Sequence, residues 1–218
     1  MAHRTLITPE DVAAYEQYLD DGYPARAEVI RHICERLANT GPYRDGHDLK
    51  VLELACGPGA LAEAMVKHAP LSWYEGIDIS QASLDYARER VNALGDHGVY
   101  TMWRQADLNE DAWMYDVVAP FDAVVSMQAL HDLGGRDEVK GMMTVAGGLL
   151  NRGGRFIYAD LLRQPDDAPD AHPGRLTVEE HVAMLQKAGL VEARCTLETG
   201  GFGCFEANQE NTSLLPTF

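Results

Sequence analysis

The chain has 218 residues, of which 46% are hydrophobic and 24% are charged, and its formal net charge is −16. A chain of this length can bury the core of one domain, and its composition is that of an ordinary globular protein. Because so acidic a chain repels a phosphate backbone and its lysines and arginines form no run longer than a pair, we expect no nucleic-acid partner.

The cysteines and the hydropathy pattern exclude two further classes. The four cysteines form no CxxC pair and no zinc spacing with histidine, which predicts reduced thiols and no metal site. No segment approaches the ~20 apolar residues that span a bilayer, and Met1–Glu10 has no apolar core of the kind found in signal peptides. We therefore expect a cytoplasmic protein with no membrane partner.

The first 48 residues predict two helices. Thr8–Asp11 combines a hydroxyl cap, a proline and two acidic residues, the typical start of a helix. This helix carries Val12, Tyr15 and Leu19 on one side, and a second helix over 25–37 has apolar residues four apart. A polar linker over 41–48 follows. We interpret 1–48 as a helical cap or lid segment.

The central stretch is Lys50–Met65, KVLELACGPGALAEAM. A short apolar run predicts a strand buried on both faces, Gly57-Pro58-Gly59 breaks it, and helical spacing resumes at Ala60. Glycines in such a turn permit positive φ angles and close approach of a ligand, and the following helix presents free N–H groups. Glu53 precedes the turn at the carboxyl end of the strand, where open α/β sheets bind ligands.

The remainder alternates strands with helices, which predicts a doubly wound, mostly parallel sheet with right-handed crossovers. Four strands follow the central one, separated by two long helices and, before the last strand, a turn. The strands are expected at 73–78, 99–106, 121–127 and 155–160, the helices at 80–94 and 137–150, and the turn at 151–154.

The chain ends differently. A proline- and aspartate-rich loop over 163–175 leads to a capping box at Thr177–Glu180 that opens a helix. Two strands, 190–197 and 202–207, are joined by Gly200-Gly201 and predict an antiparallel hairpin. The predicted fold class is therefore α/β, a seven-stranded Rossmann-like sheet over 49–208 that ends in this hairpin, with the N-terminal helices as a cap and 209–218 as a tail.

The glycine turn fits two kinds of nucleotide. Gly57–Ala62 matches GxGxxA, and Asp78 lies about 20 residues on, as a ribose-binding acid does in dinucleotide sites. Three features favour another ligand. Glu53 stands four residues before the first glycine, Pro58 removes a backbone donor that a pyrophosphate needs, and Asp107 ends the third strand, where an adenine amine needs an acceptor. The YxxxK pair of short-chain dehydrogenases is also absent from the sequence.

Five segments together resemble the successive motifs of class I S-adenosylmethionine-dependent methyltransferases. They agree with the family in order and spacing over residues 50–207. The segments are Glu53–Gly59, Gly76–Ser80, Ala106–Leu108, Phe121–Ser126 and Leu150–Gly154. The resemblance implies S-adenosylmethionine as cofactor and S-adenosylhomocysteine as product.

The resemblance also implies a set of cofactor-contacting residues at the ends of the strands. Glu53 and the glycine backbone would hold the cationic methionine end, and the Asp78 carboxylate would accept both ribose hydroxyls. Ile79 would pack on the adenine, Asp107 would accept from its amine, and two residues ending the fourth strand would border the methyl group. The full set is Glu53, Gly57, Gly59, Asp78, Ile79, Asp107, Leu108, Met127 and Gln128.

The acceptor is less constrained by sequence. Ser126–Ala129 replaces the Asn/Asp-Pro-Pro-aromatic run of exocyclic-amine methyltransferases, and no Pro-Cys for cytosine attack is present. Leu130–Leu133, LHDL, resembles the LHDW stretch of small-molecule O-methyltransferases, in which the histidine is the base. Leu133 replaces the tryptophan, and these 218 residues hold no counterpart of that family's long N-terminal dimerisation domain. His131 is thus a candidate base, or else a cavity-lining or structural residue.

We expect methyl transfer to a small molecule, with a hydroxyl acceptor favoured over nitrogen or carbon. Acceptor-side candidates are Tyr15, Tyr18 and Tyr23 on the N-terminal segment and His172 in the proline-rich loop. Asp160 either faces the pocket or caps a neighbouring element. Two alternatives stay open: non-methylating chemistry on the same cofactor, such as cyclisation or elimination, and a non-catalytic cofactor-binding regulator. The chain is expected to be a monomer or a homodimer.

Overall fold

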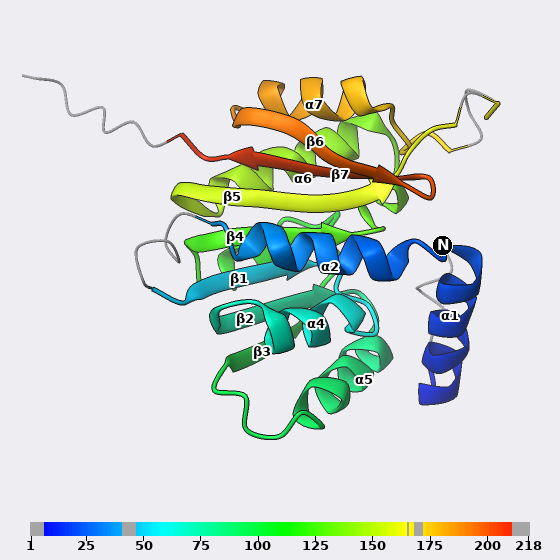
Figure 1. The fold of residues 1–218 in the computed structure, drawn as a ribbon, viewed down its shortest axis with the longest axis vertical. Helices are drawn as coiled ribbons and strands as arrows, with labels where there is room; N and C mark the ends of the chain where they lie inside the picture. The colour runs from blue at the N-terminus through cyan, green and yellow to red at the C-terminus, as the bar shows by residue number, and fades with distance from the viewer. Residues whose placement is uncertain (1–6, 41–46, 165, 168–171, 211–218) are drawn as a thin grey trace, which may run out of the picture.

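A computed structural model describes residues 7–40, 47–164, 166–167 and 172–210 (Figure 1). Within them, seven strands form one sheet in the order β3-β2-β1-β4-β5-β7-β6. The strands are β1 Leu49–Leu54, β2 Leu71–Asp78, β3 Tyr100–Gln105, β4 Phe121–Met127, β5 Leu150–Leu161, β6 Val191–Thr199 and β7 Phe202–Asn208. Neighbours pair in parallel except at β7, which runs antiparallel to both β5 and β6. The expected fold class, including the terminal hairpin, is confirmed.

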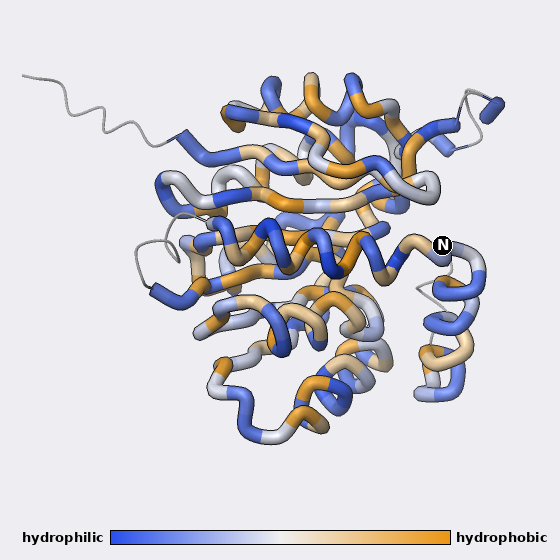
Figure 2. The backbone as a smooth tube through the Cα atoms, in the orientation of Figure 1, coloured by the Kyte–Doolittle hydropathy of each residue, from blue (hydrophilic) through white to orange (hydrophobic). Residues whose placement is uncertain are grey.

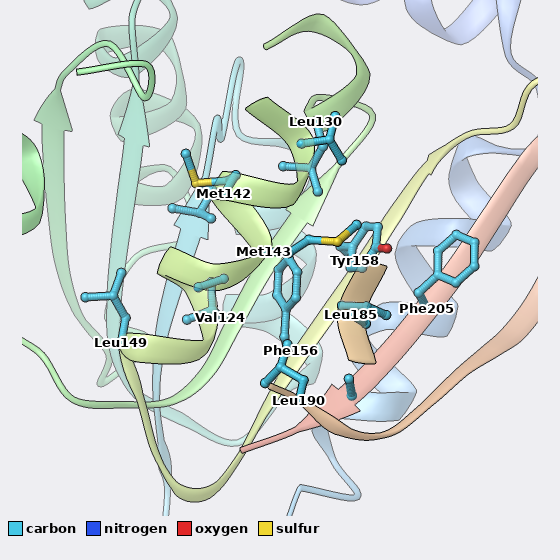
Figure 3. Close-up of a cluster of buried hydrophobic side chains, with 14 of the residues drawn as sticks. Val124, Leu130, Met142, Met143, Leu149, Phe156, Tyr158, Leu185, Leu190 and Phe205 are labelled. Atoms are coloured by element: carbon cyan, nitrogen blue, oxygen red, sulfur yellow. The ribbon is translucent and has the colours of Figure 1, made fainter. Parts of the chain in front are cut away.

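Helices cover both faces of the sheet. The helices of the described residues are α1 Pro9–Gly22, α2 Arg26–Leu37, α4 Ala60–His68, α5 Gln81–Asn92, α6 Arg136–Gly148 and α7 Val178–Lys187, with short 3-10 turns η2 Ala112–Tyr115 and η3 Leu130–Asp132. The buried stripe of α2 joins α4 and one face of the central strands in a single apolar cluster. Helices α6 and α7 cover the other face, where Met143 and Leu185 contact the aromatic side chains of β5 (Figure 3). Hydrophobic residues accordingly concentrate on the central strands (Figure 2).

Helix starts follow the sequence signals. Thr8 and Thr177 each form a capping box, with Asp11 and Glu180 respectively, and Ser80 accepts a hydrogen bond from the Ser83 amide. These side chains satisfy backbone N–H groups that a helix start leaves without partners. None of the helices in the described part of the chain has the length and apolar character needed to cross a bilayer.

The turn expected at 151–154 is wrong in detail, because these residues form a bulge inside β5. The register between β4 and β5 jumps from the Phe121–Leu150 pair to the Ala123–Arg155 pair. The residue that follows β7 holds the bulge: the Gly153 amide donates to the Gln209 carbonyl, and the Gln209 amide donates to the Gly154 carbonyl. A long-range contact with the end of the chain thus extends the strand to Leu150.

The two N-terminal helices are attached in different ways. Helix α2 docks on the β6–β7 hairpin through polar side chains one turn apart: Glu28 accepts from Thr199, His32 bonds Thr196, and Arg36 donates to Glu206. Helix α1 stands apart from the layers, beside α5 and at the carboxyl ends of β1 and β2 (Figure 1). The division at residue 48 stays a prediction, and much of the linker (41–46) and of the tail (211–218) lies outside the described residues.

Candidate active site

A cavity opens at the carboxyl ends of the parallel strands, beneath α1. It encloses about 1000 Å³ of space, its open mouth included. Residues of the glycine turn, the ends of β2 and β4, the segments after β3 and β4, and α1 line it. They are Tyr15, Leu19, Arg26, Glu53, Ala55, Cys56, Gly57, Pro58, Ala60, Leu61, Asp78, Ile79, Ala106, Asp107, Leu108, Asn109, Met127, Gln128, Ala129, Asp132 and Leu133. All but one of the nine residues expected to contact the cofactor are in this set.

The exception is Gly59, and the two glycines of the turn prove to do different things. Gly57 has φ +53°, and a Cβ built on it would meet nothing within 4 Å, so its backbone faces open space. Gly59 has φ +81° and precedes α4, and a Cβ there would lie 2.6 Å from the Cβ of Ala87 on α5. Gly59 therefore lets two helices pack closely, while Gly57 lies on the cavity wall.

Asp78 shapes the turn from the neighbouring strand. Its carboxylate accepts hydrogen bonds from the amides of Gly57 and Ser80, both at 2.8 Å. These two bonds fix the turn against the end of β2. The carboxylate is buried at the cavity wall, at the end of the strand adjacent to β1, and its contact with a ribose stays a prediction.

Glu53 is a buried carboxyl group at the floor of the cavity. The Tyr74 hydroxyl donates to it at 2.7 Å. Burial raises the pKa of Glu53 to about 8, the Tyr74 hydrogen bond opposes this rise, and the charge of Asp78 adds to it. A cation in the cavity would favour the ionised form, because opposite charges stabilise each other most where water is excluded.

Gln128, at the end of β4, has a strained backbone and a fixed side chain. Its φ of +56° is rare for a residue other than glycine, and its amide donates to the Ala159 carbonyl at 2.8 Å. Its side-chain oxygen accepts a 2.6 Å hydrogen bond from Arg26 Nη1. Strain of this kind is often found at functional sites.

Arg26 is a site residue that the sequence reasoning missed. It is buried, its Nε donates to Asp20 at 3.0 Å, and it is the one cation among the described residues that line the cavity. A signal was available in the sequence. Arg26 precedes Val29 by three positions and shares the buried stripe of α2, where a charged side chain needs a specific partner.

His131 lies behind the cavity wall rather than on it. Its Nδ1 donates to Asp160 at 2.6 Å and its backbone amide donates to the same carboxylate at 2.9 Å. Nε2 lies 3.6 Å from Asp132, which does line the cavity. Burial lowers the pKa of His131, but the charge and hydrogen bond of Asp160, with the charge of Asp132, outweigh it and raise the pKa above 6.5. Asp160 thus orients the ring.

The acceptor-side candidates separate in the fold. Tyr15 lines the cavity, where burial raises the pKa of its hydroxyl and the nearby charge of Asp132 adds to the effect. Tyr18 is 65% exposed, Tyr23 packs edge-on against Phe202 with ring centroids 5.8 Å apart, and His172 is exposed. The structure brings only the first of these four side chains to the cavity.

Comparison with known proteins agrees with this geometry. A methyltransferase domain family matches residues 52–156. The chain is 33% identical over 104 residues to a malonyl-[acyl-carrier protein] O-methyltransferase of Brevibacillus brevis, covering 48% of this chain and 34% of that one. It is 28% identical over 136 residues to a fatty-acid O-methyltransferase of Mycolicibacterium smegmatis, covering 61% and 44%. The chain therefore spans less than half the length of these curated relatives.

Solved structures share the fold. The N-methyltransferase NodS of Bradyrhizobium japonicum with bound S-adenosylhomocysteine aligns with TM-score 0.65 at 18% identity, over 88% of this chain and 90% of that one. The magnesium protoporphyrin IX methyltransferase of Synechocystis, also with S-adenosylhomocysteine, aligns with TM-score 0.61 at 16% identity, over 83% of each chain. Residues 52–156 belong to a methyltransferase domain family. This match and the shared fold agree with the resemblance to class I S-adenosylmethionine-dependent methyltransferases, and with the cofactor, that the sequence led us to expect.

The cavity of this methyltransferase suits the cofactor of its family. Glu53, Asp78 and Asp107 place three carboxyl groups along it, and the sequence led us to expect these to contact an ammonium, a ribose and an adenine amine. Gly57 leaves room for close approach of the methionine end. The individual contacts with the cofactor stay predictions.

Proposed function

We propose that this methyltransferase transfers the methyl group of S-adenosylmethionine to an oxygen atom of a small molecule, with a hydroxyl group as the favoured acceptor. The observation that carries the proposal is the acid-lined cavity at the glycine turn, with a histidine–aspartate pair behind its wall. The two curated relatives described above are both named O-methyltransferases, which supports oxygen as the acceptor atom.

The residues would hold the cofactor at four points. Glu53 would receive the ammonium group, Asp78 the ribose hydroxyls, and Asp107 the adenine amine, with Ile79 against the adenine face. Arg26 would receive the methionine carboxylate, since a buried guanidinium suits that anion and Gln128 already holds its Nη1. When bound, the cofactor supplies a methyl carbon activated by the sulfonium, so positioning can provide most of the catalysis.

A hydroxyl acceptor must also lose a proton. As the methyl group moved from sulfur to oxygen, sulfur would keep the C–S electron pair, and the acceptor's proton would go to His131 Nε2, which lies 3.6 Å from the cavity-lining Asp132. Asp160 accepts from Nδ1, which leaves Nε2 as the basic nitrogen of the neutral ring. Asp132, at the cavity wall beside Nε2, would orient the acceptor hydroxyl.

Methyl-labelled S-adenosylmethionine tests the proposal. The protein is incubated with the labelled cofactor and, in parallel, with a cell extract, a panel of phenols and a panel of fatty acids. Label in an ether supports the hydroxyl acceptor, and label in a methyl ester assigns the oxygen to a carboxylate instead. Label found only on nitrogen or carbon refutes the oxygen assignment.

A second candidate function has one specific observation in its favour. The structure named as the [4+2]-cyclase SpnF aligns with TM-score 0.65 at 15% identity, over 85% of this chain and 81% of that one. Turnover of an acceptor without label transfer would support such non-methylating chemistry, and tight binding without any turnover a regulatory protein. The cytoplasmic location and the monomeric or homodimeric state stay predictions.

A further inference from the structure

We propose that Arg90 of α5 is a positioning residue that couples the glycine turn to helix α1, so that cofactor binding and closure of α1 over the cavity depend on one guanidinium. The proposal rests on the proposed use of the cavity for S-adenosylmethionine. It assigns a function to a residue that touches neither the cofactor nor the acceptor.

Arg90 joins three parts of the chain. Its Nη1 donates both to the Glu16 carboxylate on α1 and, at 3.1 Å, to the Pro58 carbonyl in the glycine turn. Its Nε lies 3.0 Å from Glu63, in the first turn of α4. The side chains of Arg90 and Glu16 are only 24% and 12% exposed, so water screens their charges weakly.

The contact with Pro58 bears directly on the cofactor site. Pro58 lines the cavity between Gly57 and Gly59, two residues of positive φ whose lack of a Cβ leaves the turn to be held by its hydrogen bonds. Arg90 holds the carbonyl of this turn, and through Glu63 it also contacts the first turn of α4, the helix that follows. A planar guanidinium can make these bonds in several directions at once, which an ammonium group cannot do as well.

Helix α1 buries little surface against the other described residues. Only Val12 and Leu19 of its residues are buried, and it packs chiefly against α5 (Figure 1). Two ion pairs add to this attachment, Glu16 with Arg90 and Asp20 with Arg26. Since Tyr15 and Leu19 line the cavity, the position of α1 decides how far the cavity is covered.

The guanidinium of Arg90 thus links the glycine turn, on the cavity wall, to α1, which covers the cavity. A ligand that fixes the glycine turn would hold the Pro58 carbonyl in place, which keeps Arg90 in the geometry that binds Glu16. Coupling between two sites is reciprocal in free energy, so loss of the link must weaken ligand binding as well as closure. A local element with little buried surface is also the kind that opens and closes most easily.

The chain offers a matched control on the same helix. Arg88 pairs with Asp85 at 2.7 Å, and both side chains are nearly half exposed. The variants R90Q, R88Q and E16Q are compared with the wild type by calorimetric titration with S-adenosylhomocysteine, and by hydrogen exchange of α1 with and without that ligand. Circular dichroism and thermal unfolding establish that each variant is folded.

In the wild type, S-adenosylhomocysteine should slow exchange in α1. The R90Q variant should lose this slowing and bind the ligand about tenfold more weakly or worse, the effect of losing a charge-assisted hydrogen bond. The E16Q variant should lose the slowing with a smaller loss of affinity, because the bond to Pro58 remains. The R88Q variant should match the wild type in both measurements.

Ligand-induced slowing of α1 that persists in both R90Q and E16Q overturns the proposal, as does an equal effect of R88Q. Should R90Q fail to fold, E16Q alone decides between the two outcomes. A wild type that binds S-adenosylhomocysteine without any change in α1 refutes the coupling alone, whereas a wild type that does not bind it refutes the proposed function.

Discussion

Glu53 should link cofactor binding to the release of a proton. With a pKa of about 8, this carboxyl group is protonated in the free protein at pH 7, whereas the ammonium of a bound cofactor favours the ionised form. Binding should therefore expel close to one proton between pH 6 and pH 7. The affinity for S-adenosylhomocysteine should rise by about tenfold over that interval, the limit that one coupled proton sets.

The same carboxyl group should make the free protein less stable as pH rises. Its pKa in the folded state lies about 3.5 pH units above the ordinary value of 4.5, so the folded protein keeps a proton that the unfolded chain has lost. Each pH unit in this window costs about 1.36 kcal/mol. From pH 5 to pH 8 the free energy of unfolding should therefore fall by about 3.5 kcal/mol relative to the Glu53→Gln variant, since the loss levels off as the pH approaches the folded-state pKa.

Two measurements check this. Calorimetric titration at pH 6.5 in buffers of different ionisation enthalpy counts the protons released, and urea denaturation of the free protein gives the stability at pH 5 and pH 8. The Glu53→Gln variant should release no proton. The Glu75→Gln variant, a buried glutamate on β2 outside the cavity, is the control and should release the same proton as the wild type. Binding without proton release, with equal affinity at pH 6 and pH 7, would refute the reasoning.

Three further predictions concern single residues. Gly59→Ala should lower the free energy of unfolding by about 3 kcal/mol or more, because it combines a positive φ with a clash against Ala87. Gly57→Ala should lower the free energy of unfolding by only about 1 kcal/mol and should chiefly weaken cofactor binding. Urea denaturation measures the loss of stability, and calorimetric titration measures the loss of cofactor affinity. Glu206→Ala should destabilise the fold by about 3–5 kcal/mol, since three arginines pair with this buried carboxylate. Burial raises the pKa of Glu206, but the arginines outweigh burial and lower the pKa below its ordinary value. The stability that Glu206 supplies is therefore present above pH 4.5 and is lost as the pH falls further, which acid denaturation measures. His131→Gln should abolish turnover of a hydroxyl acceptor without changing cofactor affinity, and wild-type turnover should rise with pH through a histidine pKa above 6.5; near-normal turnover of the variant removes His131 from the mechanism.

Most residues of the cavity wall could be predicted from the sequence because their positions follow from local patterns. Glu53, Gly57 and Asp78 each stand at the end of a strand whose apolar run is visible in the sequence, and the ends of parallel strands meet at one edge of the sheet. The glycines mark the turn because few other residues tolerate its backbone angles. The alternation of strands and helices and the terminal hairpin follow from the same short-range pattern, and the right-handed crossovers follow from the general handedness rule.

The surroundings of that site depend on contacts between residues far apart in the chain. Tyr15 and Tyr18 lie three positions apart on α1, yet only the first lines the cavity, because the docking of α1 on α5 decides which side of the helix faces inward. Residues 151–154 read locally as a turn and became part of a strand through hydrogen bonds to Gln209.

The amino-acid sequence by itself predicted the fold class from periodic patterns and turns, the cofactor from a family resemblance over 50–207, and the carboxyl groups that line the cavity from their places at the ends of strands. Only the tertiary structure showed that Arg26 lies on the cavity wall, that His131 lies behind this wall against Asp160, and that Gly59 serves the close packing of α4 on α5. Those positions depend on which helices and strands pack against each other. The free energy of that packing comes from buried apolar surface and buried charge pairs between distant residues, which a local sequence pattern does not show.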